Sequence, residues 1–272
     1  MRGYTPFVTN APDLPGAPFD IIGDVHGCFT ELSNLLTQAG YQIEEFDPAS
    51  AAPIHLHHPK GRRMVLVGDL TDRGPQSNLV LRLALGLQEQ GLLLATIGNH
   101  DWKLARCLRG NKVNISGGLD GTLTQIAPLG QDFADAVRDM IFALPYQIRL
   151  PMPEGHPRAG DGVMTVVHGA APAHHLDGGR ENSFERSIYG YACGTSDDGT
   201  ILRSDWADGY DGLRWVIHGH EPHAEPRVHN RVIAVDTGCV FGGSMTLYRT
   251  DEMTFLREPA RCDHSGKNRK LM

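Results

Sequence analysis

Five short segments of this 272-residue chain place Asp, Asn or His beside glycine: "GDVHG" (23–27), "GDLTDRG" (68–74), "GNHD" (98–101), "HGA" (168–170) and "HGH" (218–220). One such segment alone is most often only a turn. Together they offer oxygen and imidazole donors without a thiolate, a set that suits Mn, Fe, Zn or Mg rather than a soft metal. Five of them in one chain therefore indicate a shared metal site.

Short apolar runs rich in β-branched residues precede these segments. The runs cover residues 19–24, 64–69, 92–99, 163–169, 214–220 and 232–238. Continuous apolar runs of this length predict buried strands in a sheet that is covered on both faces. Polar residues at the carboxyl ends of such strands lie where open α/β sheets bind ligands.

Helical patterns separate the early runs. In "TELSNLLTQAG" (30–40) apolar residues recur at i, i+3, i+4 and i+7, with Thr30 as the expected cap and Gly40 as the expected end. "NLVLRLALGLQEQG" (78–91) and "DWKLARCLRG" (101–110) follow the same pattern. Alternating strands and helices predict a layered α/β domain, and the strand-rich second half predicts a mixed sheet.

Composition narrows the class of protein. The formal charge of −7 disfavours an extended nucleic-acid surface, which needs clustered Lys and Arg. The five cysteines form no C-x-x-C pair and are expected to be reduced thiols. The proline-bearing N-terminus does not resemble a signal peptide, and no apolar run is long enough to span a bilayer, so we expect a cytoplasmic protein with no membrane partner.

The chain is expected to divide into an extended N-terminal arm (1–18), a catalytic domain (19–256) and a polar basic tail (257–272). Residues 174–198, rich in Gly, Tyr and charge, form the expected specificity insert, because loops on a rigid scaffold commonly select the substrate. Within the insert, Tyr189 and Tyr191 either stack on a base or pack the insert itself.

A resemblance covers residues 19–256. "DIIGDVHGC", "GDLTDRGP", "GNHDWKLARCLRG", "YGYACGTSDDGTILRSDWA", "HGHEPHAEP" and "DTGCVFGG" resemble the calcineurin-like metallophosphoesterases, the superfamily of the phosphoprotein phosphatases. The similarity is strongest to the branch that holds the phosphatase domain of bacterial polynucleotide kinase-phosphatase and the PrpE-type diadenosine tetraphosphatases. It implies an α/β fold, a layered αββα sandwich with mixed sheets.

The resemblance also implies two divalent metal ions, with Mn expected and Fe, Zn, Ni or Mg as alternatives. Asp24 and His26 would hold the first ion and Asp69 would bridge both. The second site would be completed by Asn99, His168 and His220. A metal-bridging hydroxide would then attack phosphorus, as in other two-metal hydrolases.

The same resemblance assigns catalytic roles. His100 would protonate the leaving oxygen, with Asp72 orienting its imidazole. Arg73 would bind phosphate through its planar fork of donors. Arg203 is a candidate second phosphate ligand, although a surface salt bridge remains open for it.

Neighbouring residues are expected to support the site rather than to act in it. Asp101 is expected to cap a helix or to support the metal ligands, Asp236 to be structural or to support them, and Cys28 and Cys239 to pack. In "HGHEPH" (218–223), His218 is expected in the core and His223 at the rim. The remaining histidines of Pro- or Gly-bounded loops are expected in solvent: His55, His57, His58, His174 and His175.

The expected function is a metal-dependent phosphohydrolase acting on a small phosphorylated substrate. Dinucleoside polyphosphates are one substrate class, and nucleotide or RNA-end phosphates, including 2′,3′-cyclic phosphates, are another. No P-loop motif occurs, so the chain carries no kinase module of that type. A serine/threonine phosphoprotein phosphatase is the alternative, and a non-catalytic binding module is a remote one.

Overall fold

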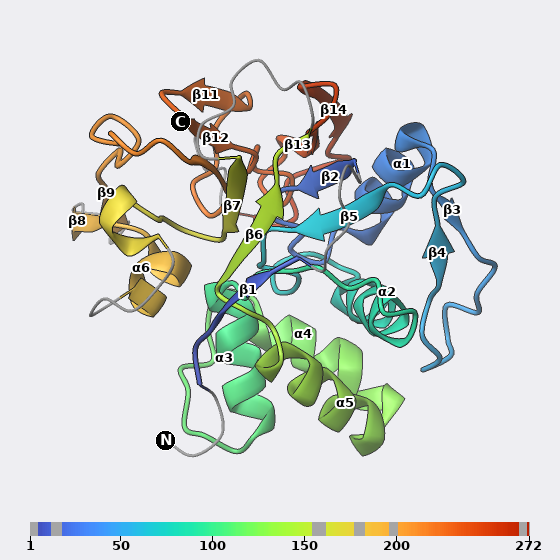
Figure 1. Cartoon of the computed structure of the whole chain (residues 1–272). Helices are drawn as coiled ribbons and strands as arrows, with labels where there is room; N and C mark the ends of the chain where they lie inside the picture. The colour runs from blue at the N-terminus through green and yellow to red at the C-terminus, as the bar shows by residue number, and fades with distance from the viewer. Residues whose placement is uncertain are drawn as a thin grey trace.

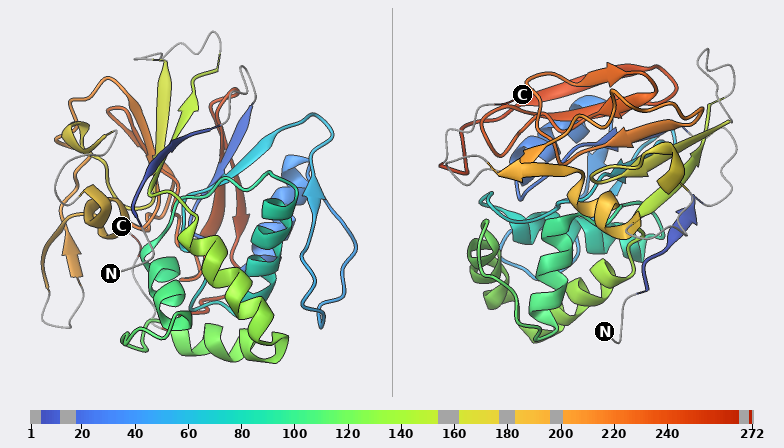
Figure 2. Two further views of the ribbon diagram at one scale, coloured as in Figure 1. Left: turned by 60° about the horizontal axis from the view of Figure 1, so that its bottom comes forward. Right: turned by 90° about the vertical axis from the view of Figure 1, so that its left-hand side faces the viewer.

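In a computed structural model, the chain is described over residues 5–11, 18–153, 162–176, 183–195, 201–266 and 271. Two mixed sheets pack face to face, with helices against one of them (Figures 1 and 2). None of the helices described has the length and apolar character needed to cross a bilayer.

The larger sheet has the order β1-β6-β7-β10-β12-β11. Its strands are β1 (Val8–Asn10), β6 (Gln147–Pro151), β7 (Val163–Val167), β10 (Trp215–His218), β12 (Val232–Ala234) and β11 (Arg227–His229). β7, β10 and β12 are parallel, whereas β6 and β11 run antiparallel to their neighbours β7 and β12. The N-terminal arm therefore contributes an edge strand, because β1 pairs with β6 in parallel.

The smaller sheet has the order β14-β13-β2-β5. Its strands are β14 (Thr254–Pro259), β13 (Ser244–Arg249), β2 (Phe19–Ile22) and β5 (Arg63–Leu66). β2 and β5 are parallel, so their carboxyl ends meet at one edge. β14 continues to Pro259, beyond the domain boundary expected at residue 256, because its pairing with β13 extends that far.

Successive side chains of a strand point to opposite faces of its sheet, so each strand of the smaller sheet faces two cores. Ile21 of β2 points into the core between the two sheets, where it meets residues such as Val166 and Ile217. Its neighbour Ile22 points the opposite way, into the core beneath the helices. The outer face of the larger sheet is covered by Trp206 and the residues that cluster with it rather than by a long helix.

Five helices share one hydrophobic core with the smaller sheet: α1 (Phe29–Ala39), α2 (Ser77–Glu89), α3 (Asn99–Leu108), α4 (Leu119–Ile126) and α5 (Gln131–Phe142). α3, α4 and α5 gather at one end of the molecule (Figure 1). The remaining elements are α6 (Ser183–Tyr189), the short turns η1 (Ala127–Leu129) and η2 (Ala173–His175), and two small hairpins. The hairpins are β3 (Gln42–Ile43) with β4 (Leu56–His57), and β8 (Ala192–Thr195) with β9 (Ile201–Arg203).

Two expectations are wrong. Residues 92–99 form no named strand, and only Ala95 bridges to Leu66 of β5. Thr30 does not cap α1: Cys28 is the N-cap residue, and the Thr30 hydroxyl instead donates to Gln76 on the α2 side. Gly40 does end α1, in the left-handed conformation that glycine adopts without strain.

Candidate metal centre

The loops that follow four strands and the start of one helix converge on a single point. Asp24 and His26 follow β2, Asp69 follows β5, and Asn99 opens α3. His168 and His220 follow β7 and β10 in the other sheet. The backbone joins these loops, because the His26 amide donates to the Asp69 carbonyl and the Gly219 amide donates to the His168 carbonyl. All six predicted metal ligands lie in the described region and come together.

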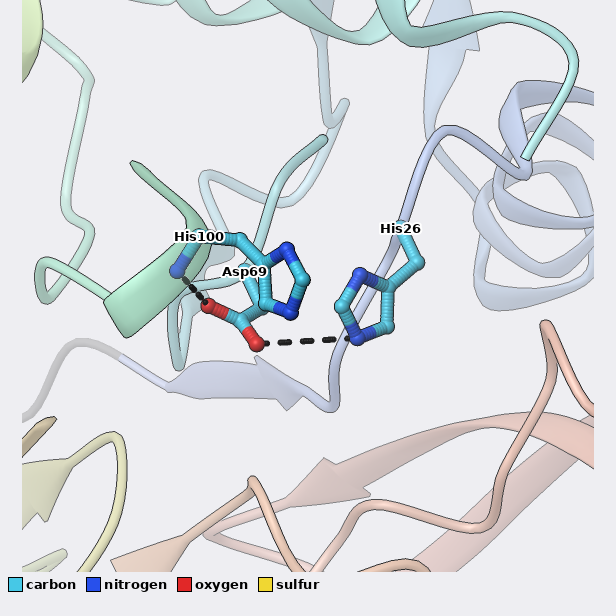
Figure 3. A group of neighbouring side chains, drawn as sticks. All are labelled: His26, Asp69 and His100. Atoms are coloured by element: carbon cyan, nitrogen blue, oxygen red, sulfur yellow. Dashed lines mark hydrogen bonds and ion pairs between the residues drawn. The ribbon is translucent and has the colours of Figure 1, made fainter. Parts of the chain in front are cut away.

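The Asp69 carboxylate lies between two histidines. Its Oδ2 atom is 3.5 Å from Nε2 of His26 and 3.3 Å from Nε2 of His168. Its Oδ1 atom accepts the backbone N–H of His100 at 2.9 Å, as Figure 3 shows together with the contact to His26. Asp69 therefore contacts donor atoms carried by both sheets.

Backbone carbonyls fix the tautomers of two ligand histidines. Nδ1 of His26 lies 2.9 Å from the Thr71 carbonyl, and Nδ1 of His168 lies 3.1 Å from the Val67 carbonyl. Since a carbonyl can only accept, both Nδ1 atoms carry the proton. Both Nε2 lone pairs then face Asp69, which is the arrangement of metal-binding histidines.

A second group of lone pairs surrounds His168. Its Nε2 atom lies 3.0 Å from Nδ1 of His220 and 3.2 Å from Oδ1 of Asn99. Ligands bound at about 2.0–2.2 Å around one divalent ion are spaced at about 3.0–3.5 Å. These donors therefore fit a divalent ion, as does the group formed by Asp69, His168 and His220.

Asp24 closes the other side of the centre. Its carboxylate accepts the His220 N–H at 3.1 Å and lies 4.0 Å from Nε2 of His26. Burial, with the negative charge of Asp236, raises its pKa well above the usual range. Buried carboxylates at this density need cations to stay ionised, and two divalent ions between Asp24 and Asp69 would provide them.

The charges at Asp69 and His168 depend on each other. Burial alone would raise the pKa of Asp69, but His168 and His100 hold it well below the usual value. Burial alone would lower the pKa of His168, but Asp69 and Asp24 raise it to about 9. A metal ion bound by the Nε2 lone pair would replace this proton.

The site stores backbone strain. Seven described residues other than glycine have positive φ, and five of them are predicted site residues: His26, Asp69, Asp72, Arg73 and His220. Such conformations cost about 1–3 kcal/mol each and persist where the surrounding structure enforces them. Their concentration here marks the functional part of the molecule.

Two glycines permit the close approach of the ligands. A Cβ atom on Gly98 would lie 2.2 Å from Oδ1 of Asp69, and one on Gly219 would lie 2.0 Å from Oδ1 of Asp24. Neither carboxylate could keep its place beside an alanine, which explains the glycines of "GNHD" and "HGH".

His100 has a different partner from the ligand histidines. Its Nδ1 atom lies 2.6 Å from Oδ2 of Asp72, and the hydroxyl of Thr122 donates to the other oxygen of that carboxylate at 2.7 Å. The ring packs edge to face against His26 at 4.9 Å. This contact leaves Nε2 of His100 as the atom that could meet a substrate, and the predicted catalytic role stays a prediction. The role of Thr122 in holding Asp72 had no signal in the sequence.

Arg73 lies at the centre. Its Nη1 atom donates to Nε2 of His26 at 2.6 Å, and its guanidinium lies over Phe241 at 5.4 Å. Arg203 ends β9, but its side chain lies outside the described residues, so its predicted role stays a prediction.

The supporting residues are placed mostly as expected. Asp101 accepts the N–H groups of Gly98 and Leu70 and so caps α3. Burial and Asp69 raise its pKa to about 7. Cys28 and Cys239 are buried in the core, within 4.8 Å of each other and of the Glu31 carboxylate.

The three histidines of "HGHEPH" lie in different surroundings. His220 joins the metal centre, His218 is buried against Trp206, and His223 is half-buried outside the cluster. Asp236 accepts the Gly238 amide in a turn. The expectation for His175 is wrong, because it is 8% exposed and its ring packs on His174.

A set of cations near the centre was missed. Lys103 and Arg106 on α3 and Lys112 after it line a cleft together with Asn99 and Tyr189. The signal was present, since Lys103 and Arg106 are three residues apart on one helix face. The sequence analysis predicts this helix but assigns no role to its cations. Tyr191, by contrast, packs under the Arg186 guanidinium at 4.3 Å.

The sequence is similar to that of known phosphoesterases over most of its length. Residues 17–224 match the family model of the calcineurin-like phosphoesterases. The chain is 36% identical over 243 residues to the bis(5'-nucleosyl)-tetraphosphatase PrpE [asymmetrical] of Bacillus subtilis, covering 89% of this chain and 94% of that protein. It is also 36% identical over 246 residues to the protein of the same name from Halalkalibacterium halodurans, with the same coverage.

A solved structure shares the fold. The crystal structure of "a putative diadenosine tetraphosphatase" superposes with a TM-score of 0.62 at 21% identity, covering 94% of this chain and 99% of that one. The family match and the curated relatives decide the classification. The chain belongs to the calcineurin-like phosphoesterase family and is a hydrolase of phosphate esters or anhydrides.

Proposed function

We propose that this chain is a two-metal hydrolase that cleaves dinucleoside polyphosphates into unequal products. The observation that carries the proposal is the Asp69 carboxylate, which lies 3.5 Å and 3.3 Å from the Nε2 atoms of His26 and His168. A carboxylate shared by two groups of donors is the arrangement that holds two metal ions side by side.

Six side chains would hold the metals. Asp24 and His26 would hold the first ion, Asn99, His168 and His220 would hold the second, and Asp69 would be shared by both. The donors are hard oxygens and imidazoles, which favours Mn, with Fe, Zn, Ni or Mg as alternatives. When bound, the two ions supply an activated water and neutralise phosphate charge.

The protein's own groups complete the reaction. Arg73 would bind the phosphate oxygens, because its guanidinium lies 2.6 Å from Nε2 of His26, beside the place where the first ion would be held. His100 donates a proton from Nε2 to the leaving oxygen. Its Nδ1 faces a carboxylate rather than a carbonyl, and Asp72 can therefore stabilise the imidazolium that carries this proton.

The substrate class rests on the relatives. Two curated proteins named as tetraphosphatases match 94% of their own length, so the similarity is not confined to the metal motifs. Dinucleoside polyphosphates therefore rank above RNA-end phosphates and phosphoproteins as substrates.

The test is a substrate panel with Mn²⁺: diadenosine tetraphosphate, a nucleoside 2′,3′-cyclic phosphate, a phosphopeptide and an aryl phosphate. We expect the largest kcat/KM for the tetraphosphate, with unequal nucleotide products. Asp69→Asn should lose bound metal and turnover together. A phosphopeptide rate above the tetraphosphate rate would refute the substrate class, and full activity of Asp69→Asn would refute the metal centre.

A further inference from the structure

A cleft of about 330 Å³ opens beside the metal centre. Its lining includes Asn99, a predicted metal ligand, and Tyr189 of α6. Because Asn99 belongs both to the predicted metal ligands and to the lining, the cleft adjoins the metal centre.

The lining carries a concentrated positive charge. Lys103, Arg106 and Lys112 contribute three cations, and no acidic residue is found among the described residues of the lining. The whole chain has a formal charge of −7, so this concentration runs against the overall balance. In the described part of the chain, no ion pair joins these three cations to a carboxylate. They are therefore available to a phosphate chain.

We call Lys103, Arg106 and Lys112 the cationic strip. Its first member, Lys103, lies close to the predicted catalytic histidine. A Cβ atom on Gly117 would lie 3.3 Å from Cε1 of His100 and 3.6 Å from Nζ of Lys103. The ammonium and the imidazole thus flank the same glycine. Nζ of Lys103 also donates to the Ser116 carbonyl at 2.5 Å, which fixes its position there.

The far part of the strip is built on a rigid aromatic base. Trp102 packs edge to face against Phe142 and Phe184, at 5.9 Å and 5.4 Å between ring centroids. The Arg106 guanidinium lies 5.8 Å from the Trp102 ring. Tyr189 is 46% exposed, so part of its ring is open to a ligand.

We propose that this cleft binds the polyphosphate chain of the leaving nucleotide, with Lys103, Arg106 and Lys112 contacting the phosphates beyond the attacked phosphorus. The inference rests on the proposed function and adds the part of the protein that selects a polyphosphate over a simple monoester. An aryl phosphate reaches only the metal centre, whereas a dinucleoside tetraphosphate occupies both.

The test compares Arg106→Gln/Lys112→Gln with Arg109→Gln. Arg109 lies at the end of the same helix but over Phe142, outside the cleft lining. Two charge-assisted contacts to neighbouring phosphates are lost together and should not add fully, so we expect kcat/KM for diadenosine tetraphosphate to fall by about 100-fold in the double variant. Turnover of an aryl phosphate should stay within about twofold in both variants.

Binding of inorganic tripolyphosphate, measured by calorimetry with Mn²⁺ in excess, tests the cleft separately from the proposed hydrolase function. We expect its Kd to rise at least tenfold in the double variant and to be unchanged in Arg109→Gln. Wild-type Kd and tetraphosphate kinetics in the double variant would overturn the cleft while leaving the proposed function intact. A wild-type protein that binds tripolyphosphate through these residues but does not cleave the tetraphosphate would overturn the proposed function alone.

Discussion

Oδ2 of Asp72 lies 2.6 Å from Nδ1 of His100, and both side chains are buried. The two residues come from different elements, the loop after β5 and the first turn of α3. The Thr122 hydroxyl holds the second carboxylate oxygen at 2.7 Å, so the imidazole cannot rotate without losing a buried hydrogen bond. His100 is thereby presented to the site through Nε2.

Asp72→Asn should lower turnover without removing metal. The amide cannot stabilise an imidazolium, so proton delivery to the leaving oxygen should slow by about 10²–10⁴-fold for substrates with poor leaving groups. Aryl phosphates, whose leaving groups need less protonation, should lose much less. Steady-state kinetics on both substrate types, with metal content measured in parallel, checks this.

Thr122→Val is the matched comparison, because it leaves the Asp72 carboxylate in place and removes the hydroxyl that donates to that carboxylate and accepts the Asp72 backbone N–H. We expect a loss smaller than that of Asp72→Asn and the same dependence on the leaving group. An equal loss on aryl phosphates and poor substrates in Asp72→Asn would rule out the acid role of His100.

His220→Ala and His223→Ala should behave differently although the residues are three positions apart. Nδ1 of His220 lies 3.0 Å from Nε2 of His168, whereas His223 is half-buried outside the cluster. We expect His220→Ala to lose one of two bound metal ions and His223→Ala to keep both. Elemental analysis after removal of excess metal gives the number of ions bound per chain. Metal loss by His223→Ala would contradict the ligand set.

Much of the site was predictable because ligand residues follow buried strands. Parallel strands bring their carboxyl ends together, so Asp24 and Asp69 had to meet once β2 and β5 were recognised. The same reasoning could not find Thr122, since a threonine inside α4 has no distinguishing spacing.

Some elements depend on tertiary pairing. The apolar run 92–99 has the composition of a strand, yet it gains only the bridge between Leu66 and Ala95. Thr30 has the residue type of a cap, but α1 begins before it at Phe29, and the Gln76 side-chain oxygen accepts both the N–H and the hydroxyl of Thr30. Propensity is a local quantity, and in both places a distant partner decides the outcome.

Gly219→Ala should abolish metal binding. The added Cβ would lie 2.0 Å from Oδ1 of Asp24 and 2.7 Å from Val67, so the carboxylate must move. We expect a stability loss of about 1–3 kcal/mol as well. Gly209→Ala is the control, because its Cβ would meet nothing closer than 4.0 Å. Chemical denaturation and metal analysis would show the difference, and a fully metallated Gly219→Ala would contradict it.

Alkylation of exposed thiols should leave activity intact. Cys193 and Cys262 are exposed, whereas Cys28 and Cys239 are buried. The hydrogen bond with Cys28, together with burial, raises the pKa of the Cys239 thiol and keeps it unreactive. We expect iodoacetamide to label Cys193 and Cys262 in the native protein, as mass spectrometry would show, without loss of turnover. Inactivation that tracks labelling of Cys28 would point to a thiol in the reaction.

Stability should fall in acid through His218. Burial lowers its pKa from 6.5 to about 4, and its Nδ1–H donates to the Gly219 carbonyl. Between pH 6.5 and about 4 the unfolded chain therefore binds a proton on His218 that the folded chain does not bind. The stability that the neutral His218 side chain provides is present above pH 6.5 and is lost as the pH falls to about 4. The expected change is about 3 kcal/mol across that window. His218→Asn should flatten the free energy of unfolding between pH 6.5 and 4, while His57→Asn, on the exposed end of β4, should leave the slope unchanged. Denaturant titrations at a series of pH values measure the free energy of unfolding. An equal dependence of this free energy on pH in wild type and His218→Asn would show that other groups cause the acid sensitivity.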